Sequence, residues 1–208
     1  MTVIQLKCFF KLFDTQVVPV LLYGAEIWGF QSYDQIERIH LYACKRLLHV
    51  TNKTPNDMIY GELGRYPLWI NSVIKCIKYW FRLLKQPDHF FSKKAYKMLS
   101  NLHERGTVTW VTRIQSILCE NGFEQVWLFG CGQEKLFFRE LKERLHSSFC
   151  FRWYDHVENS SRFSIYKQYK TCFGKEKYVD ILWMNIYRNV LAQFRMGVSQ
   201  INVHKYRY

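Results

Sequence analysis

The sequence has little negative charge, few chain-breaking residues and no long apolar run. It contains 17 acidic residues against 30 basic ones among 208, with four prolines and ten glycines. The most apolar stretch, residues 17–30, includes Glu26 and is too short to span a bilayer of about 30 Å at roughly 1.5 Å per residue. Lys7, Lys11 and Asp14 interrupt the apolar first residues of the chain, whereas the core of a secretory signal is an uninterrupted apolar run. We therefore expect no membrane partner.

The usual signatures of catalysis are also missing. Polymerisation or hydrolysis of polynucleotides requires clustered carboxylates that hold divalent metals, yet the sequence has no Asp-Asp pair and its six aspartates are scattered. The phosphate-binding pattern GxxxxGK[ST] and the patterns GxGxxG and GxSxG do not occur,. We expect no enzymatic activity, no catalytic residues, no cofactor and no small-molecule substrate.

The cysteines form neither a disulfide framework nor a zinc motif. There are seven, an odd number, with no CxxC pair, which favours an intracellular, reducing compartment, cytoplasmic and/or nuclear. His40 and Cys44 lie one helical turn apart, and His146, Cys150 and His156 are loosely spaced. A structural zinc site needs four ligands, usually in two close pairs, so we expect no metal site.

The sequence is rich enough in apolar residues to fold, since 49% are hydrophobic and 18% aromatic,. Helical periodicity dominates, and we predict an all-α protein. The expected helices are Ile4–Trp28, kinked or divided at Pro19, Tyr33–Val50, Pro55–Leu63, Leu68–Gln86, Lys93–His103, Trp110–Asn121, Gln133–Val157 and Tyr178–Met196,. Gln86-Pro87-Asp88 is the expected boundary. It gives a helical domain over 1–86, a basic connecting helix or linker over 87–105 and a C-terminal helical domain over 106–208.

Local signals predict how several helices end and which faces they bury. Thr54 suits an N-cap, with Pro55 at the first helical position and Asp57 completing a capping box, and Gly64, Gly122 and Gly197 are expected stops. The spacing predicts two buried stripes. In the second helix these residues are Ile36, Ile39, Ala43, Leu47 and Val50, and in the last helix they are Trp183, Ile186, Val190 and Phe194.

The positive charge is concentrated in two segments. Residues 65–105 hold nine basic against two acidic side chains and residues 151–208 hold ten against four, whereas 1–64 and 106–150 are each neutral. These differences account for the whole formal charge of +13. Such an excess favours polyanionic partners. A solubilising surface is the alternative, although it usually mixes both signs.

The helix expected over Leu68–Gln86 carries the first candidate binding residues. Lys75, Lys78, Arg82 and Lys85 fall within about 80° of its helical wheel, opposite an apolar stripe. The residues of that stripe are Ile70, Val73, Ile77, Trp80 and Leu84. A solvated face would also produce this pattern. Four cations without an acid favour phosphate contact, because a merely soluble helix gains from interleaved Glu.

A second candidate group lies near the C-terminal end. Arg162, Tyr166, Tyr169 and Lys170 share a predicted helical face. This mixture of basic and aromatic side chains could stack on bases and bind phosphates. Tyrosines that pack in the core are the alternative interpretation.

Several stretches together resemble a known family. Residues 17–29 (VVPVLLYGAEIWG), 36–40 (IERIH), 54–55 (TP) and 58–68 (MIYGELGRYPL) follow one another as in the region after the polymerase palm of non-LTR (LINE-type) retrotransposon reverse transcriptases. The resemblance is strongest over residues 5–86, which are similar to the thumb-like region. It continues through short matches at Trp110-Val111, Asn121-Gly122-Phe123 and Phe194-Arg195.

The resemblance implies a role in binding without a reaction. A helical thumb grips the template-primer duplex in that family, and the palm with its metal-binding aspartates would precede Met1. We therefore expect a nucleic-acid-binding fragment of such an enzyme, with RNA or an RNA/DNA hybrid as its partner and no polymerase activity of its own. The alternative is a helical interaction or scaffold protein, or the non-functional relic of a retroelement.

Overall fold

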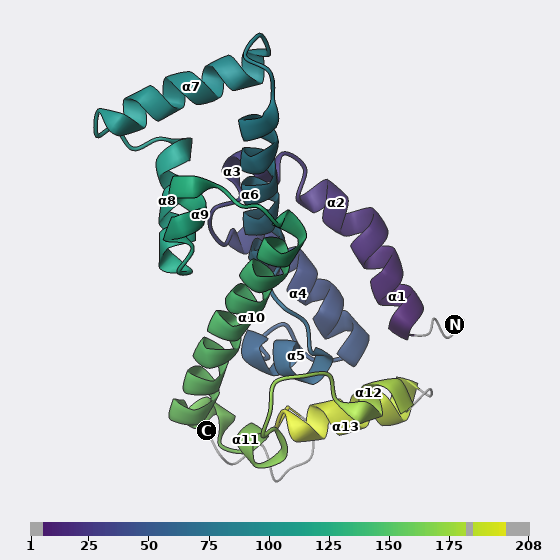
Figure 1. Cartoon of the computed structure of the whole chain (residues 1–208). Coiled ribbons are helices and arrows are strands. Elements are labelled where there is room, and N and C mark those ends of the chain that lie inside the picture. The colour runs from purple at the N-terminus through teal and green to yellow at the C-terminus, as the bar shows by residue number, and fades with distance from the viewer. Residues whose placement is uncertain (1–5, 182–184, 199–208) are drawn as a thin grey trace. The chain divides into compact units, whose positions relative to one another are not determined.

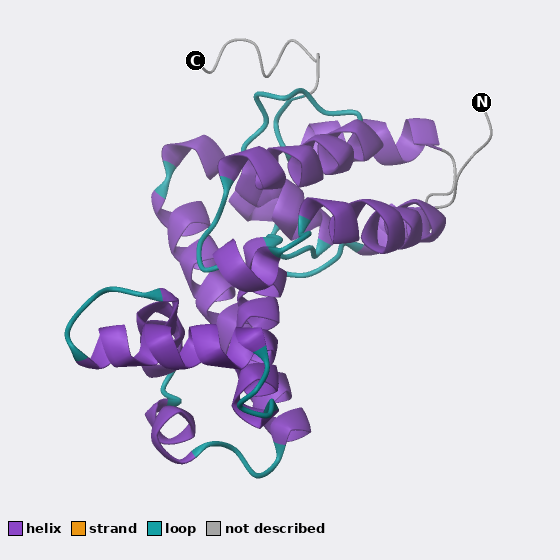
Figure 2. Cartoon of the chain, turned by 90° about the horizontal axis from the view of Figure 1, so that it is seen from above, coloured by secondary structure: helices purple, strands orange, loops and turns teal. Residues whose placement is uncertain are grey.

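The computed structural model describes residues 6–181 and 185–198. Their regular structure is helical (Figures 1 and 2). Within these ranges the β-structure is confined to one isolated bridge between Leu63 and Lys175. The prediction of an all-α fold is confirmed.

The chain forms two compact units, each assembled from separate segments. Unit 1 comprises residues 1–21, 34–67 and 148–208, and unit 2 comprises residues 22–33 and 68–147. The boundaries expected at residues 86 and 105 do not coincide with those of the units. Proline and charge patterns mark local breaks, whereas the units are defined by contacts between segments distant in sequence.

Unit 1 is built around α4 and α5, which pack together, with α13 also against α4. Its elements are α1 (Leu6–Leu12), the π-helix η1 (Phe13–Val17), α2 (Val18–Leu21), α4 (Asp34–Leu48), α5 (Asn56–Leu63), the end of α10 (Glu134–Asn159), η2 (Ser161–Phe163), α11 (Tyr166–Tyr169), α12 (Lys177–Ile181) and α13 (Asn185–Arg195). Side chains from several of these elements form its core. They include Leu41, Cys44, Leu48, Ile59, Leu63, Trp153, Phe163 and Tyr166.

Unit 2 is centred on α6, which packs against α3, α7 and α8. Its elements are α3 (Ala25–Trp28), α6 (Trp69–Lys85), α7 (Phe91–Glu104), α8 (Trp110–Glu120), α9 (Glu124–Phe129) and the first part of α10. The approach of α3 to α6 is close, since a Cβ on Gly29 would lie 2.7 Å from Cβ of Ser72. The Sγ of Cys76 also donates to the carbonyl of Ala25 over 3.1 Å.

The first predicted helix is divided, although not at Pro19. The segments α1, η1 and α2 run on as one rod (Figure 1), and Pro19 lies inside α2. The π-helical turn ends two residues before Pro19. Pro19 has no backbone N–H, and its ring would clash with the preceding turn of a regular α-helix. The break comes instead at Gly24, whose φ of 68° is left-handed,.

The short helix α5 ends as predicted but begins differently. Its C-cap is Gly64, with φ 59°, as expected for a left-handed stop. Its N-cap is Pro55, with no side-chain cap, so the prediction of Thr54 as N-cap is wrong. The Thr54 hydroxyl instead lies 3.3 Å from that of Thr51.

The predicted buried stripes of α4 and α13 are wrong. On α4 the side chain of Ile39 is 46% exposed, and the remaining predicted residues are not buried either. The buried residues there are Glu37, His40, Leu41, Cys44, Lys45 and Leu48. On α13 the residues expected in the core are exposed, namely Ile186, Val190 and Phe194, and Trp183 lies outside the described residues. Hydrogen bonds from other segments allow α4 to bury its polar residues.

Candidate nucleic-acid interface

The amphipathic helix α6 has its predicted inner face. Ile70, Val73, Ile77 and Trp80 are each at most 2% exposed, which confirms that stripe. Leu84 is 37% exposed, and Leu83 is buried in its place. The helix therefore presents its basic side to solvent because the opposite side is fixed in the core of unit 2.

Lys75 does not belong to that exposed side. Its side chain is only partly exposed, and its ammonium group donates a hydrogen bond of 2.9 Å to the carbonyl of Leu22. This bond ties α6 to the turn before α3. We therefore build the candidate interface without Lys75, since one of the three donors of its ammonium group is already used within the unit,.

The other three cations of α6, Lys78, Arg82 and Lys85, are exposed. Lys78 lies over the ring of Phe138 at 5.6 Å, and Arg82 lies over Tyr79 at 4.7 Å. Lys85 is 68% exposed and forms an ion pair of 2.5 Å with Glu134. Exposed pairs of this kind contribute about 0–1 kcal/mol to stability.

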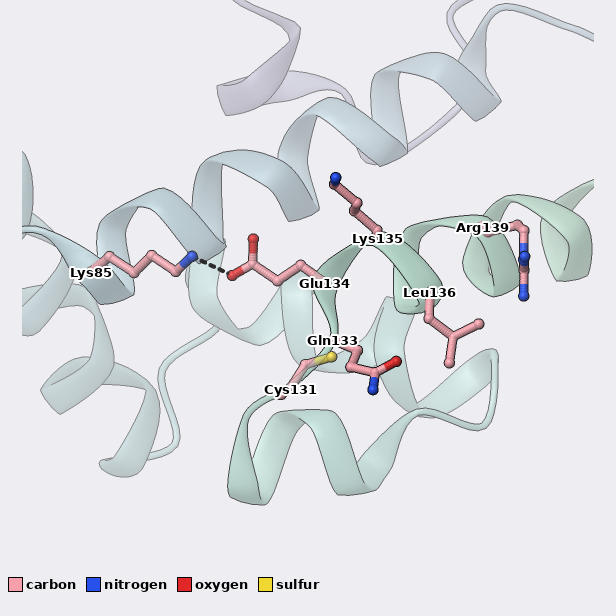
Figure 3. A pocket seen from close by; sticks show the side chains of 8 residues that line it. Lys85, Cys131, Gln133, Glu134, Lys135, Leu136 and Arg139 are labelled. Atoms are coloured by element: carbon pink, nitrogen blue, oxygen red, sulfur yellow. Dashed lines mark ion pairs between the residues drawn. The ribbon is translucent and has the colours of Figure 1, made fainter.

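A hollow of about 810 Å³ lies beside Lys85 in unit 2 (Figure 3). Lys85, Lys135 and Arg139 are the cations among its lining residues, and Glu134 is the acid. The other lining residues are Cys131, Gly132, Gln133 and Leu136. Lys135 and Arg139 were not predicted from the sequence. Residues 106–150 have no net charge, and a count of charges does not show that basic side chains gather on one side of a helix.

The second candidate group does not form one surface. Arg162 is exposed and Tyr169 is 43% exposed, but Tyr166 is fully buried and Lys170 is 4% exposed. The Tyr166 hydroxyl donates to the carbonyl of Met58, and burial raises its pKa. The ammonium of Lys170 pairs with Glu176 at 2.5 Å. Tyr166 and Lys170 are enclosed by the fold, so they cannot serve as contact residues on its surface.

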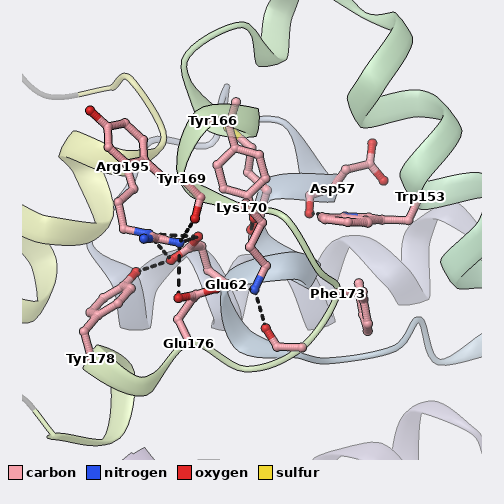
Figure 4. Close-up of polar contacts among 12 residues, drawn as sticks. Asp57, Glu62, Trp153, Tyr166, Tyr169, Lys170, Phe173, Glu176, Tyr178 and Arg195 are labelled. Atoms are coloured by element: carbon pink, nitrogen blue, oxygen red, sulfur yellow. Dashed lines mark hydrogen bonds and ion pairs between the residues drawn. The ribbon is translucent and has the colours of Figure 1, made fainter.

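Lys170 belongs to a charged cluster inside unit 1 (Figure 4). Glu62, with no exposed surface, accepts hydrogen bonds of 3.1–3.2 Å from Arg195 and one of 2.6 Å from the Tyr178 hydroxyl. Arg195 also pairs with Glu176. Burial by itself would lower the pKa of Arg195. The hydrogen bonds to Glu62 and the charge of Glu62 outweigh this effect, so the pKa of Arg195 is raised. Glu62 is the one acid in the apolar segment 58–63, and this was the sequence feature that could have indicated a buried charge.

The histidines and cysteines considered as metal ligands do not converge. His40 pairs with Glu37 at 2.7 Å, and burial raises the pKa of the Cys44 thiol to about 12. His156 contacts Asp57 at 2.7 Å. Across the described ranges, no three His, Cys, Asp or Glu side chains are placed to hold a metal ion.

Comparison with known proteins identifies no relative. No protein-family model, curated protein or solved structure matches the chain. Within the described part of the chain, none of the helices has both the length and the apolar character that crossing a membrane requires.

Proposed function

We propose that this protein binds the phosphate backbone of nucleic acid through the exposed basic side of α6. The observation that carries the proposal is the exposure of Lys78, Arg82 and Lys85 on a helix whose opposite face is buried. Their spacing of four and three residues places them on one side of the helix. Backbone contacts of this kind hold a nucleic acid without reading its sequence.

The resemblance to non-LTR reverse transcriptases supports a more specific form of the proposal. It favours RNA or an RNA/DNA hybrid as the partner and a supporting, non-catalytic role as a thumb-like region with the helical segment that follows it. The sequence offers no cluster of carboxylates that would place a metal, so we propose that the chain does not polymerise by itself. An intracellular location, cytoplasmic and/or nuclear, fits this partner.

Salt-dependent binding tests the proposal. The variant Lys78→Gln/Arg82→Gln/Lys85→Gln removes the exposed charges and leaves Lys75 in place. Binding to a short RNA/DNA hybrid should weaken, and the slope of log affinity against log salt should flatten by roughly 0.7–0.9 for each phosphate that is no longer neutralised. Thermal melts should change little, since exposed substitutions usually alter stability by about 0.5 kcal/mol or less.

A matched control removes the same charge elsewhere in unit 2. Lys94, Arg105 and Arg113 are exposed cations on or next to α7 and α8, and none lines the hollow. Their triple change to Gln should leave most of the salt slope intact. Equal slopes for the wild type and the α6 variant, with both folded, would contradict the proposal. Absence of any binding by the folded protein would favour a helical scaffold instead.

A further inference from the structure

We propose that α6 and the start of α10 form the two walls of one phosphate-binding groove. We also propose that Glu134 forms an ion pair with Lys85 as long as no strand is bound there. The ligand class is the sugar-phosphate backbone of a nucleic-acid strand. This inference rests on the proposed function, and it adds a second wall and an internal competitor, which come together only in the folded unit.

The contacts within unit 2 hold the two helices side by side. Phe81 of α6 packs against Phe137 and Phe138 of α10, with ring centroids 5.3 and 5.4 Å apart. Lys78 lies over Phe138, and Lys85 reaches Glu134. Because residues 78 and 85 meet residues 138 and 134 in that order, the basic side of α6 runs antiparallel to the start of α10.

The second wall repeats the spacing of the cations of the first. Lys135, Arg139 and Lys142 of α10 are all exposed, and their spacing of four and three residues places them on one side of the helix. The spacing is identical to that of Lys78, Arg82 and Lys85. Glu140 follows Arg139 by one residue, so a rotation of about 100° turns it away from this stripe. Glu143 follows Arg139 by four residues and lies at the edge of the stripe, beside Arg139.

The hollow joins the two walls. Lys85 from α6 and Lys135 and Arg139 from α10 line the same space of about 810 Å³, which is within the range of about 300–1,000 Å³ typical of ligand sites. Figure 3 shows Glu134 between Lys85 and the other two cations. Three cations around one carboxylate leave an excess of positive charge that a phosphodiester backbone would neutralise.

Glu134 is placed to act as a displaceable substitute for a phosphate. Its carboxylate lies 2.5 Å from the ammonium of Lys85, and the two side chains are 33% and 68% exposed. Pairs this exposed are weak because water and salt screen them. A strand that enters the groove can therefore replace the carboxylate at Lys85, at the cost of bringing phosphates close to Glu134.

The first experiment removes the second wall. The variant Lys135→Gln/Arg139→Gln/Lys142→Gln is compared with the wild type, with the α6 variant and with the Lys94/Arg105/Arg113 control, by salt titration on a hybrid duplex and on single-stranded RNA. We expect the slope to flatten by roughly 0.9 on a duplex and roughly 0.7 on a single strand for each phosphate that the variant leaves unneutralised. The control should change it less.

The outcomes separate this inference from the proposed function. If the α6 variant flattens the slope and the α10 variant does not, the second wall is wrong and the proposed function stands. If the protein binds but neither variant differs from the control, the groove and the proposed function are both wrong. Circular dichroism of each variant confirms that it is folded, and a folded wild type that binds neither probe also overturns both.

The second experiment tests the competitor. Glu134→Gln should raise affinity about twofold to fivefold, the range that corresponds to releasing one weak surface pair, and should steepen the salt slope. Glu143→Gln removes an exposed charge from the same helix away from the hollow and should give a smaller gain. The gain should disappear in Lys85→Gln/Glu134→Gln. Equal effects of Glu134→Gln and Glu143→Gln would overturn the role of Glu134.

Discussion

The Nε–H of Arg65 donates a hydrogen bond of 3.0 Å to Nε2 of His40, whose side chain has no exposed surface. Arginine can only donate, so Nε2 of His40 carries a lone pair and the ring proton belongs on Nδ1, 2.7 Å from Oε1 of Glu37. The Tyr60 hydroxyl donates to the same carboxylate oxygen, and Arg65 continues to Asp14. This chain of hydrogen bonds links η1, α4 and α5.

We predict that the ring of His40 carries its proton on Nδ1. The reason is that Nε2 must accept from Arg65 while Nδ1 must donate to Glu37. Long-range proton–nitrogen NMR correlations of the imidazole ring distinguish the tautomers. The variant Arg65→Met removes the donor and should weaken the preference. A proton found on Nε2 of the wild type would show that Arg65 does not donate to this ring.

We predict that Arg195→Met destabilises unit 1 by about 3–5 kcal/mol, because it leaves the buried carboxylate of Glu62 without its counter-charge. Adding Glu62→Gln should recover part of that free energy, since a neutral amide needs no cation. Urea unfolding followed by circular dichroism measures both changes.

The matched control for that ion pair is Lys167→Met. Lys167 and Glu158 form a surface pair of 3.4 Å in the same unit, with side chains 37% and 72% exposed. Its loss should cost about 0–1 kcal/mol. A cost for Arg195→Met no larger than this would mean that the buried pair is not needed for stability.

We predict that Gly61→Ala destabilises the protein although alanine favours helices by about 1 kcal/mol. A Cβ at this position of α5 would meet the Tyr166 hydroxyl and lie 2.7 Å from the ring of Trp153. Overpacking of this kind typically costs about 1–3 kcal/mol. At Gly132 a Cβ would meet no atom within 4 Å, so Gly132→Ala should not destabilise. A higher melting temperature for Gly61→Ala would contradict this packing.

Thiol alkylation offers a test of both units at once. Burial raises the pKa of Cys44 in unit 1 and Cys76 in unit 2 to about 12, and the thiolate is the reactive form. At mildly alkaline pH, iodoacetamide should modify the exposed Cys8 and Cys172 first. Cys44 and Cys76 should react only after denaturation. Peptide mass spectrometry follows each site, and rapid labelling of Cys76 in the folded protein would contradict the packing of α3 on α6.

The sequence alone predicted the all-α class and most of the long helices. The pattern of α6 was sufficient because Ile70, Val73 and Ile77 recur at helical spacing and pack on one side,. The stops at Gly64 and Gly122 were also predictable, since both adopt a left-handed conformation that glycine adopts at little cost. These features depend on neighbours within a few residues, which the sequence displays directly.

The buried faces of α4 and α13 and the second basic wall depended on the tertiary structure. On α4 the polar His40 is buried and Ile39 is exposed, because Arg65, 25 residues away, supplies a hydrogen bond. Glu62 is buried because Arg195, 133 residues away, neutralises it. Helical periodicity is a local property of the chain, whereas burying a charge requires a partner. Distant partners of this kind meet only when the chain has folded.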